Sequence, residues 1–425
     1  MKKTGVALLG LGTVGGGTYR ILKNNFESIK KHDGIEVEIR HIIERDISKA
    51  EALGADLSIV GTDINAVIND PETTIVAEFF GGIEPAKTFL TKCLLAGKSI
   101  VTANKELFSK HWSELEAAAK KGGAGLYFEA SCVGGVPIIR TLTQSMQGNN
   151  ILSLMGIVNG TTNFILSKMA DDNAEYDDVL KEAQRLGYAE ANPTADVDGF
   201  DSMYKLSILS SLAFHTKVPI SQIYREGISK ISKLDIAFGK KFGYTLKLLA
   251  IAKKNDEGKI EARVHPAFIP ESHPLASVKG SFNAVFITGD NVGDIMLYGR
   301  GAGDLPTGSA IVSDIVFAAK QSEPQYTSFK NSDKVKVSDF SKNFSCRYYV
   351  RMSVKDEAGV LAKISSIFAK NNISIDTMQQ ISDTNGATLI FLIHKTFENN
   401  INKAVSVIAK QPCINSVDAI IRVEK

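Results

Sequence analysis

The sequence predicts an α/β protein in which a doubly wound parallel sheet is followed by an α+β part and by a small ferredoxin-like part. Two observations predict this order. Short apolar runs alternate with amphipathic helical stretches over residues 4–131, whereas the pattern strand, helix, strand, strand, helix, strand fills residues 346–425. With 425 residues, 44% of them hydrophobic and 23% charged, the chain can bury roughly two or three cores.

Five apolar runs predict the strands of the first part, at residues 4–10, 37–43, 73–80, 98–103 and 124–131. An amphipathic stretch over residues 13–30 predicts a helix after the first strand, and further helical stretches separate the later strands. Strands that are joined through helices pair in parallel with right-handed crossovers. The alternation therefore predicts a sheet with helices on both faces.

A glycine-rich turn lies between the first strand and its helix. Gly10, Gly12 and Gly15 match the pattern G-x-G-x-x-G, with Thr13 and Val14 inside it. The first glycine permits a tight turn, the second lets the backbone approach a pyrophosphate, and the third allows close packing of helix and strand. A plain glycine-rich turn is the alternative reading, but the position between a first strand and a helix favours a Rossmann-type dinucleotide site.

The end of the second strand bears on which dinucleotide is bound. Glu44 could accept a hydrogen bond from the ribose 2′-hydroxyl of NAD, whereas Arg45 could pair with the 2′-phosphate of NADP. The sequence carries both signals. We favour NADP, with NAD as the alternative.

The middle of the chain predicts an α+β substrate-binding and dimerisation domain over residues 135–320. Its predicted strands lie at residues 151–160, 262–269, 282–290 and 294–301. We expect the first domain to cover residues 1–134 and to be completed by an apolar helix at 305–321. Residues 322–345 are polar and read as a linker to the third domain at 346–425.

A cluster of carboxylates precedes an apolar helix predicted over residues 201–215. Glu190, Asp196, Asp198 and Asp201 stand close in sequence before Lys205. A calcium loop, a helix cap and a surface ion pair are the simpler readings. On a helix, however, Asp201 and Lys205 share a face, and a lysine held beside carboxylates stays protonated, as a general acid must. Glu190 and Asp201 could then hold an ammonium or hydroxyl group of a substrate.

The surrounding motif is specific to one family. The chain resembles homoserine dehydrogenases in the pattern Ala183-x-x-x-Gly187-Tyr188-Ala189-x-x-Asn192-Pro193-x-x-Asp196-Val197-x-Gly199-x-Asp201-x-x-x-Lys205. Further matching motifs are Val101–Lys105, Glu129–Pro137 and Asn159–Asn163. With the glycine turn, the resemblance covers roughly residues 1–320 in the expected order.

The resemblance implies reversible reduction of L-aspartate 4-semialdehyde to L-homoserine by NAD(P)H, on the way to threonine, methionine and isoleucine, without a catalytic metal. Lys205 is implied as the proton donor, Lys105 as a second acid or binding cation, and Glu190 and Asp201 as substrate ligands. Asp196 and Asp198 are expected to be structural residues of the loop or to surround Lys205 from behind the substrate ligands. The implied residues on the cofactor side are Thr102, Lys105, Gly187 and Gly303, of which Gly303 also fits a plain strand-to-helix turn.

The resemblance also implies a sodium ion that is not catalytic. Its ligands would be Glu129 and the backbone carbonyls of Cys132, Gly134 and Val136. Cys132 departs from the small or aliphatic residues usual in such a loop, but a carbonyl ligand does not depend on the side chain. With no histidine nearby in sequence, Cys132 is not expected to be a redox nucleophile.

The C-terminal domain resembles an ACT domain in the run Asp356-x-x-Gly359-Val360-Leu361-Ala362-x-Ile364. Such domains pair edge to edge and bind small amino acids. The resemblance implies feedback inhibition, most simply by L-threonine, with Asp356, Gly359, Val360 and Asn372 around the effector. The alternative is that this domain only dimerises the chain. A homodimer or homotetramer is expected in either case.

Charge, hydropathy and cysteines exclude other classes. The net charge of +2 with no basic run argues against nucleic acid, and no run reaches the roughly 18 apolar residues of a membrane span. The four scattered cysteines indicate neither disulfides nor zinc, and a reducing cytoplasm fits them. Because the first strand begins at residue 4, we expect an enzyme without a preceding kinase domain.

Two alternatives to the enzyme remain open. A reductase of another semialdehyde would use the same residues, because pocket size cannot be read from the sequence. A nucleotide-bound amino-acid sensor would use only the first and third domains. The sensor leaves Lys105, Glu190, Asp201 and Lys205 without a role, so the sequence favours the enzyme.

Overall fold

The computed structural model describes residues 2–327, 329, 336–383 and 386–424. The contacts within the chain divide it into two compact units. The first contains residues 1–154, 204–220 and 282–335, and the second contains 155–203, 221–281 and 336–425. The predicted middle domain is therefore shared between the two units, and its boundaries stay a prediction.

The N-terminal sheet is parallel throughout and belongs to the first unit. Its strand order is β3 (Val60–Gly61), β2 (Ile35–Ile43), β1 (Lys2–Leu9), β4 (Thr73–Glu78), β5 (Ser99–Thr102) and β6 (Leu126–Tyr127). The order reverses at β1, so the carboxyl ends of β1 and β4 flank the switch point where doubly wound sheets bind ligands. The predicted doubly wound fold is confirmed.

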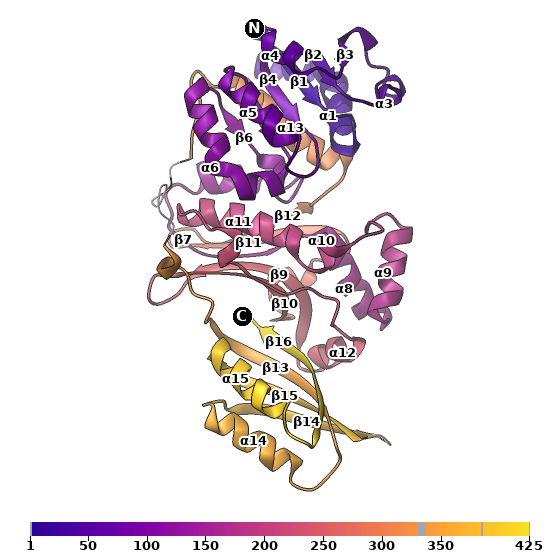
Figure 1. Cartoon of the computed structure of the whole chain (residues 1–425), viewed down its shortest axis with the longest axis vertical. Coiled ribbons are helices and arrows are strands. Elements are labelled where there is room, and N and C mark those ends of the chain that lie inside the picture. The colour runs from indigo at the N-terminus through magenta and orange to yellow at the C-terminus, as the bar shows by residue number, and fades with distance from the viewer. Residues whose placement is uncertain (1, 328, 330–335, 384–385, 425) are drawn as a thin grey trace. The chain divides into compact units, whose positions relative to one another are not determined.

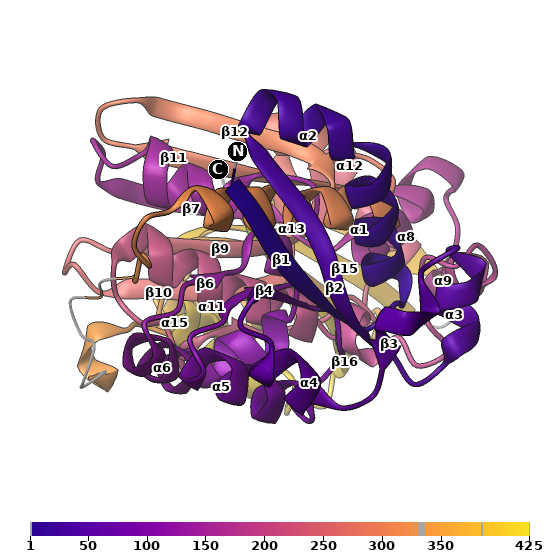
Figure 2. The same cartoon turned by 90° about the horizontal axis from the view of Figure 1, so that it is seen from above.

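Helices cover both faces of this sheet (Figure 2). On one face lie α1 (Thr13–Asn24) and α13 (Asp304–Lys320), and on the other lie α4 (Ile64–Asn69), α5 (Ala86–Leu95) and α6 (Lys105–Gly122). Two local predictions were wrong. The helix predicted over 13–30 breaks at Asn25, after which α2 (Phe26–Asp33) begins, and the strand predicted over 124–131 pairs only as the short β6. A further short helix, α3 (Ile47–Ala52), follows β2.

Helix α13 packs into the core of the N-terminal sheet although it lies far away in sequence. Ile311 and Ile315 of α13 are fully buried in one cluster with Val6 and Leu8 of β1. The helices α1 and α13 meet closely because a Cβ added at Gly17 of α1 would stand 2.2 Å from the carbonyl oxygen of Asp304. The helix predicted at 305–321 thus forms where expected.

The remainder of the first unit includes α7 (Ile138–Arg140) and an antiparallel hairpin of β11 (Phe282–Gly289) and β12 (Gly293–Arg300). Strand β7 (Ile151–Ile157) and helix α11 (Phe200–Phe214) each cross from one unit into the other.

The second unit is built on β9 (Tyr244–Lys254) and β10 (Ile260–Pro270), which pair antiparallel along their whole length. Strand β9 was missed because LKLLAIAKK reads equally well as an apolar helix. The same unit holds a short strand, β8 (Tyr224–Arg225), which pairs with β10. Its remaining helices are α8 (Gly160–Asp172), α9 (Tyr176–Arg185), α10 (Thr194–Val197) and α12 (Lys233–Lys241).

The C-terminal part has the predicted ferredoxin-like order (Figure 1). Its elements are β13 (Ser345–Val354), α14 (Val360–Lys370), β14 (Ile375–Asp383), β15 (Gly386–Phe397), α15 (Glu398–Ile408) and β16 (Ile414–Val423). The strands are antiparallel in the order β16-β13-β15-β14. Strand β16 also pairs in parallel with β10 through Ala267–Arg422 and Phe268–Val423. This part therefore continues the sheet of the second unit.

Among the described residues, no helix combines the length and the apolar character that a membrane crossing requires.

Candidate active site

The glycine turn after β1 has the geometry that phosphate binding needs. Gly10 has a φ of +99°, and a Cβ at Gly15 would stand 2.2 Å from the carbonyl oxygen of Gly10, so both positions require glycine. Gly12 precedes α1 at the N-cap position without a side-chain cap and has open space where a Cβ would lie. The first N–H groups of α1, from Thr13 and Val14, are therefore available to an anion.

Two cavities border this turn. One, of about 400 Å³, is lined by Gly10, Gly12, Glu44, Arg45, Lys49 and Phe80 among others. The other, of about 310 Å³, lies on the side of Thr13 and Arg20. Together they give space on both sides of the uncapped helix, as an extended dinucleotide requires. The glycine turn and Arg45 fit the cofactor that the sequence predicts.

Glu44 lies at the end of β2 and is turned toward the protein. Its carboxylate accepts hydrogen bonds from the N–H groups of Leu11 (2.8 Å), Arg45 (2.9 Å) and Asp46 (3.1 Å). Burial by itself would raise the pKa of Glu44, but these backbone N–H groups together with Lys49 hold it below its usual value. The side chains of Arg45 and Lys49 are exposed at the same edge. Glu44 is thus engaged with the glycine turn, while two cations face solvent.

The ends of β4 and β5 are joined by a buried hydrogen-bond chain. The hydroxyl of Thr102 donates to Glu78 Oε2 (2.5 Å) and accepts from the N–H of Asn104 (2.9 Å). Asn104 in turn caps α6 through Leu107 N–H (3.0 Å). Glu78 is fully buried, and burial raises its pKa to about 7 although Thr102 lowers it. This chain fixes the loop that ends at Lys105, the first residue of α6.

A side chain of α6 contacts α11 within the first unit, and a second side-chain contact joins α6 to the residues that follow α11. The ammonium of Lys110 stands 5.1 Å from the centre of the Tyr204 ring, and Lys217 donates to the hydroxyl of Ser113 (2.6 Å). The two predicted lysines belong to these two helices, which the Lys110–Tyr204 contact joins. Lys205 follows Tyr204 on α11 and is 8% exposed, and Lys105 opens α6 and is half-buried.

The carboxylates before Lys205 are oriented by one amide. Asn159 donates from Nδ2 to Asp196 Oδ1 (2.7 Å) and to Asp201 Oδ2 (2.9 Å), and its Oδ1 accepts from Thr162 N–H (2.9 Å) at the start of α8. Asp201 is only 6% exposed. Asn159 therefore holds two carboxylates together in the second unit. The sequence offered Asn159 only as part of a motif, without this role.

The remaining predicted residues on this side are more exposed. Glu190 is exposed, and its backbone carbonyl accepts from Gln184 Nε2 (3.2 Å). Gly187 has a φ of +78° at the end of α9 and belongs to the second unit. Gly303 has a φ of +123° and directly precedes α13. The first residue of α13, Asp304, forms an ion pair with Arg20 of α1 (2.5 Å), the helix that follows the glycine turn. Their cofactor and substrate roles stay predictions.

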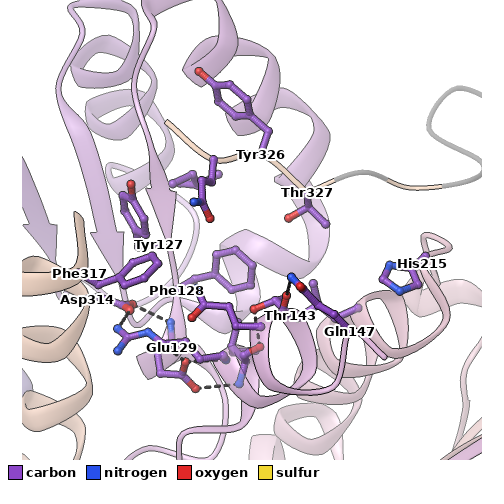
Figure 3. A pocket seen from close by; sticks show the side chains of 16 residues that line it. Tyr127, Phe128, Glu129, Thr143, Gln147, His215, Asp314, Phe317, Tyr326 and Thr327 are labelled. Carbon is purple, nitrogen blue, oxygen red and sulfur yellow. Dashed lines mark hydrogen bonds and ion pairs between the residues drawn. The ribbon is translucent and has the colours of Figure 1, made fainter. Parts of the chain in front are cut away.

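Glu129 is buried and bound to backbone (Figure 3). Its carboxylate accepts from the N–H groups of Ile139 (2.7 Å) and Arg140 (2.9 Å), at the start of α7, and its own N–H donates to Asp314 Oδ2 (2.8 Å). Arg140 also pairs with Asp314. Burial and the neighbouring Asp314 raise the pKa of Glu129 to about 7. These groups border a cavity of about 330 Å³ next to Tyr127 and other side chains of the first unit.

The predicted sodium loop follows Glu129. Val133 and Gly134 both have positive φ, 56° and 51°, and a Cβ at Gly134 would lie 2.4 Å from the carbonyl oxygen of Gly301. A positive φ is costly for valine and is found where the surroundings enforce it. Because the Glu129 carboxylate already binds two N–H groups, the sodium prediction depends mainly on the carbonyls of Cys132, Gly134 and Val136.

Comparison with known proteins identifies the family. The chain matches the model of homoserine dehydrogenase over residues 137–316, that of the homoserine dehydrogenase NAD binding domain over 10–129, and that of the ACT domain over 348–413. It is 43% identical to homoserine dehydrogenase of Corynebacterium glutamicum, covering 99% of this chain and 96% of the relative. The chain belongs to the homoserine dehydrogenase family.

Solved structures agree with this assignment. A homoserine dehydrogenase from Thiobacillus denitrificans is 41% identical and has a TM-score of 0.92. The match covers 100% of this chain and 99% of the chain in that structure. A hyperthermophilic archaeal homoserine dehydrogenase in complex with NADPH is 28% identical and has a TM-score of 0.65. The match covers 76% of this chain and 100% of the chain in that structure. The similarity to the first of these extends through the ACT domain.

In this member of the homoserine dehydrogenase family, the predicted effector residues lie at the two ends of α14, with Asp356, Gly359 and Val360 at its start and Asn372 after its end. Gly359 has a φ of +93° and starts α14, whose first residue, Val360, is buried. Asp356 Oδ1 accepts from Gln380 Nε2 of β14 (3.3 Å), and Asn372 has a φ of +55° after the same helix. Sequence reasoning placed these four residues around the effector but did not identify Gln380.

Proposed function

We propose that the chain catalyses the reversible reduction of L-aspartate 4-semialdehyde to L-homoserine with NADPH or NADH. The observation that carries this proposal is the start of α11. There a buried carboxylate, Asp201, is oriented by Asn159 and is followed one helical turn later by the buried Lys205. Buried ionisable groups are expensive for a fold and gather at sites that need them.

Each residue has a chemical role in this proposal. The nicotinamide supplies the hydride when it is bound. Lys205 donates a proton to the aldehyde oxygen, and Lys105 adds positive charge where the alkoxide develops, which lowers the barrier. Asp201 and Glu190 bind the ammonium group of the amino acid, so that the carbonyl carbon is held in one orientation.

The preference between the two cofactors is proposed to be NADP. Glu44 is already engaged by three backbone N–H groups, so its carboxylate is poorly available to a ribose 2′-hydroxyl. Arg45 and Lys49 are exposed beside it and supply two positive charges for a 2′-phosphate. Exchange of Arg45 for alanine is expected to raise the KM for NADP about 10-fold while leaving that for NAD within about 2-fold.

The experiment that tests the reaction uses the purified full chain with L-homoserine and either NADP or NAD at alkaline pH, where oxidation of the alcohol is favoured. Formation of reduced nicotinamide that depends on homoserine supports the proposal. Cofactor binding without any turnover of homoserine would instead favour a different semialdehyde as the substrate.

Regulation is proposed to reside in the ACT domain. L-threonine is the effector we propose, held around Asp356, Gly359, Val360 and Asn372, and the chain is proposed to act as a homodimer or homotetramer. Titration of the full chain with L-threonine should lower its activity, and Asp356→Ala should raise the threonine concentration needed. Equal inhibition of the wild type and Asp356→Ala by L-threonine would show that Asp356 does not bind the effector.

A sodium ion is proposed at the carbonyls of Cys132, Gly134 and Val136, with Glu129 nearby, as a support for the loop. Thermal unfolding measured in sodium chloride and in tetramethylammonium chloride of equal ionic strength tests this proposal. A higher Tm in sodium is expected, and an equal Tm in the two salts would contradict it.

A further inference from the structure

The short strand β8 lies between the ACT domain and the substrate loop. It pairs in parallel with β10, with Tyr224 opposite Arg263 and Arg225 opposite Val264, and the N–H of Glu226 donates to the Val264 carbonyl (2.8 Å). Successive side chains of a strand point to opposite sides. Tyr224 and Glu226 therefore face one way and Arg225 faces the other.

The side with Tyr224 and Glu226 is held by Arg422 of β16. The guanidinium of Arg422 forms an ion pair with Glu226, donates to the Tyr224 hydroxyl (2.8 Å) and lies 4.9 Å from the centre of that ring. Its other partner is Glu398 of α15 (2.5 Å), and the side chain of Arg422 is only 4% exposed. A buried, forked set of charged hydrogen bonds is directional, so a shift of β16 moves the groups bound to it.

The opposite side of β8 is held against the loop that precedes α11. Arg225 donates to the backbone carbonyl of Asp198, and its guanidinium carbon stands 3.6 Å from the centre of the Phe200 ring. This stacked cation contact fixes the side chain from two directions. Arg225 thus binds both a carbonyl of the loop and the first residue of α11.

The residues that follow β8 pack closely against the loop that precedes α11. The N–H of Ile228 donates to the Val197 carbonyl (2.8 Å), and a Cβ at Gly227 would stand 2.4 Å from the Val197 oxygen. Gly199 has a φ of +81°, and a Cβ added there would stand 3.2 Å from the side-chain Cγ1 of Val264 of β10. The loop from Val197 to Phe200 is therefore packed directly against the residues that follow β8 and against β10.

This loop carries the proposed substrate residue. Asp201 follows Phe200 directly. The Asn159 amide donates hydrogen bonds to the carboxylates of both Asp201 and Asp196. The segment Asp196–Asp201 is therefore held by Asn159 at its carboxylates and by Arg225 at its backbone. Arg225 touches none of the proposed reacting groups, so it acts by positioning.

We propose that β8 couples the ACT domain to the substrate site: Arg225 is a positioning residue that fixes the Asp196–Asp201 segment, and Arg422 sets the position of Arg225 through Tyr224 and Glu226. This coupling rests on the proposed function, because Asp201 is taken to bind the substrate. An amino acid that shifts β16 on binding would then alter the affinity for homoserine without touching it.

The test is a double-mutant cycle on the full chain, with kcat and KM for L-homoserine as readouts. Arg225→Met is expected to lower kcat/KM about 10-fold, mainly through KM, and Glu226→Gln about 3-fold. Because Glu226 acts through Arg225, the double variant is expected to lose no more than Arg225→Met alone. Independent residues would multiply to a loss of about 30-fold, and that result would overturn the coupling.

Three controls complete the design. Arg225→Lys keeps the positive charge but not the planar guanidinium group, and its kcat/KM should lie between those of Arg225→Met and the wild type. Glu175→Gln removes an exposed ion pair with Lys233 in the same unit and should change nothing. NADP affinity should be unchanged in all variants, which separates loss of substrate positioning from general damage. Equal kcat/KM for Arg225→Met and wild type would refute the positioning role.

Hydrogen exchange makes the outcome independent of turnover. Glu226→Gln should accelerate amide exchange in a peptide covering residues 197–201, even in a chain that fails to oxidise homoserine. If the wild type does not turn over homoserine but the exchange still changes, the proposed function fails and the coupling stands. Unchanged exchange in Glu226→Gln would overturn the coupling itself.

Discussion

Replacement of Asn159 by aspartate tests how the carboxylate cluster is held. The variant keeps the shape of the side chain and the oxygen that accepts from Thr162 N–H, but its second oxygen replaces the amide that donates to Asp196 and Asp201 at 2.7 and 2.9 Å. Two like charges about 3 Å apart repel by about 6 kcal/mol at an effective dielectric constant of about 20. A third carboxylate is therefore strongly disfavoured at this position.

The cluster can relieve this repulsion by taking up a proton. Holding one proton on a carboxyl group costs about 1.4 kcal/mol for each pH unit above a pKa of about 4. That is about 5.5 kcal/mol at pH 8 and about 3 kcal/mol at pH 6, both below the repulsion. Asn159→Asp should therefore be destabilised relative to wild type by an amount that grows by about 1.4 kcal/mol per pH unit.

Urea unfolding at pH 6, 7 and 8 measures this dependence, with kcat/KM for homoserine recorded in parallel. Asn159→Ser is the matched control, because it keeps a capping oxygen and adds no charge, so its loss should be independent of pH. A loss in Asn159→Asp that stays constant across these pH values would show that Asn159 does not bridge two ionised carboxylates.

Further predictions concern the cofactor side. Gly15→Ala should lower both the Tm and the affinity for NADP, because its Cβ would stand 2.2 Å from the Gly10 oxygen. Gly12→Ala has open space for its Cβ, so it should keep the Tm and lose only the affinity. Equal changes in Tm for the two variants in a thermal scan would refute this difference. Burial raises the pKa of Glu78 to about 7 from 4.5, so the folded chain keeps a proton that the unfolded chain releases between these values. This proton should contribute about 3 kcal/mol to the fall in wild-type stability as the pH rises through this window. In chemical unfolding, Glu78→Gln should therefore lose about 3 kcal/mol less than the wild type, because Glu129 contributes equally to both proteins.

The parallel sheet and the ACT domain could be predicted from the sequence because their signals are local. The glycine turn depends on backbone conformations that few residues other than Gly10 and Gly15 can adopt, and the strands beside it are continuous apolar runs. Strand β9 could not be separated from a helix, because an apolar run buried on both faces has no period. Its pairing with β10 decides its form, and pairing is not local.

The charged residues of the candidate site could be singled out from the sequence, but the residues that support them could not. Asp201 and Lys205 stand out by charge in an apolar helix. Asn159 and Arg225 do not, because an amide at a helix start and an arginine in a short strand are ordinary residues of a surface. Their roles depend on partners that lie 42 and 27 residues away, at Asp201 and Asp198, and only the folded chain brings these together.

The most direct test of the proposed reaction is the exchange of Lys205 for alanine in the full chain, with kcat for homoserine oxidation and the Kd for NADP measured on the same preparation. Loss of the proton donor is expected to lower kcat by about 100-fold or more and to leave the Kd within about 2-fold. A variant that retained its kcat, or that lost only its affinity for NADP, would contradict the assignment of Lys205 as the general acid.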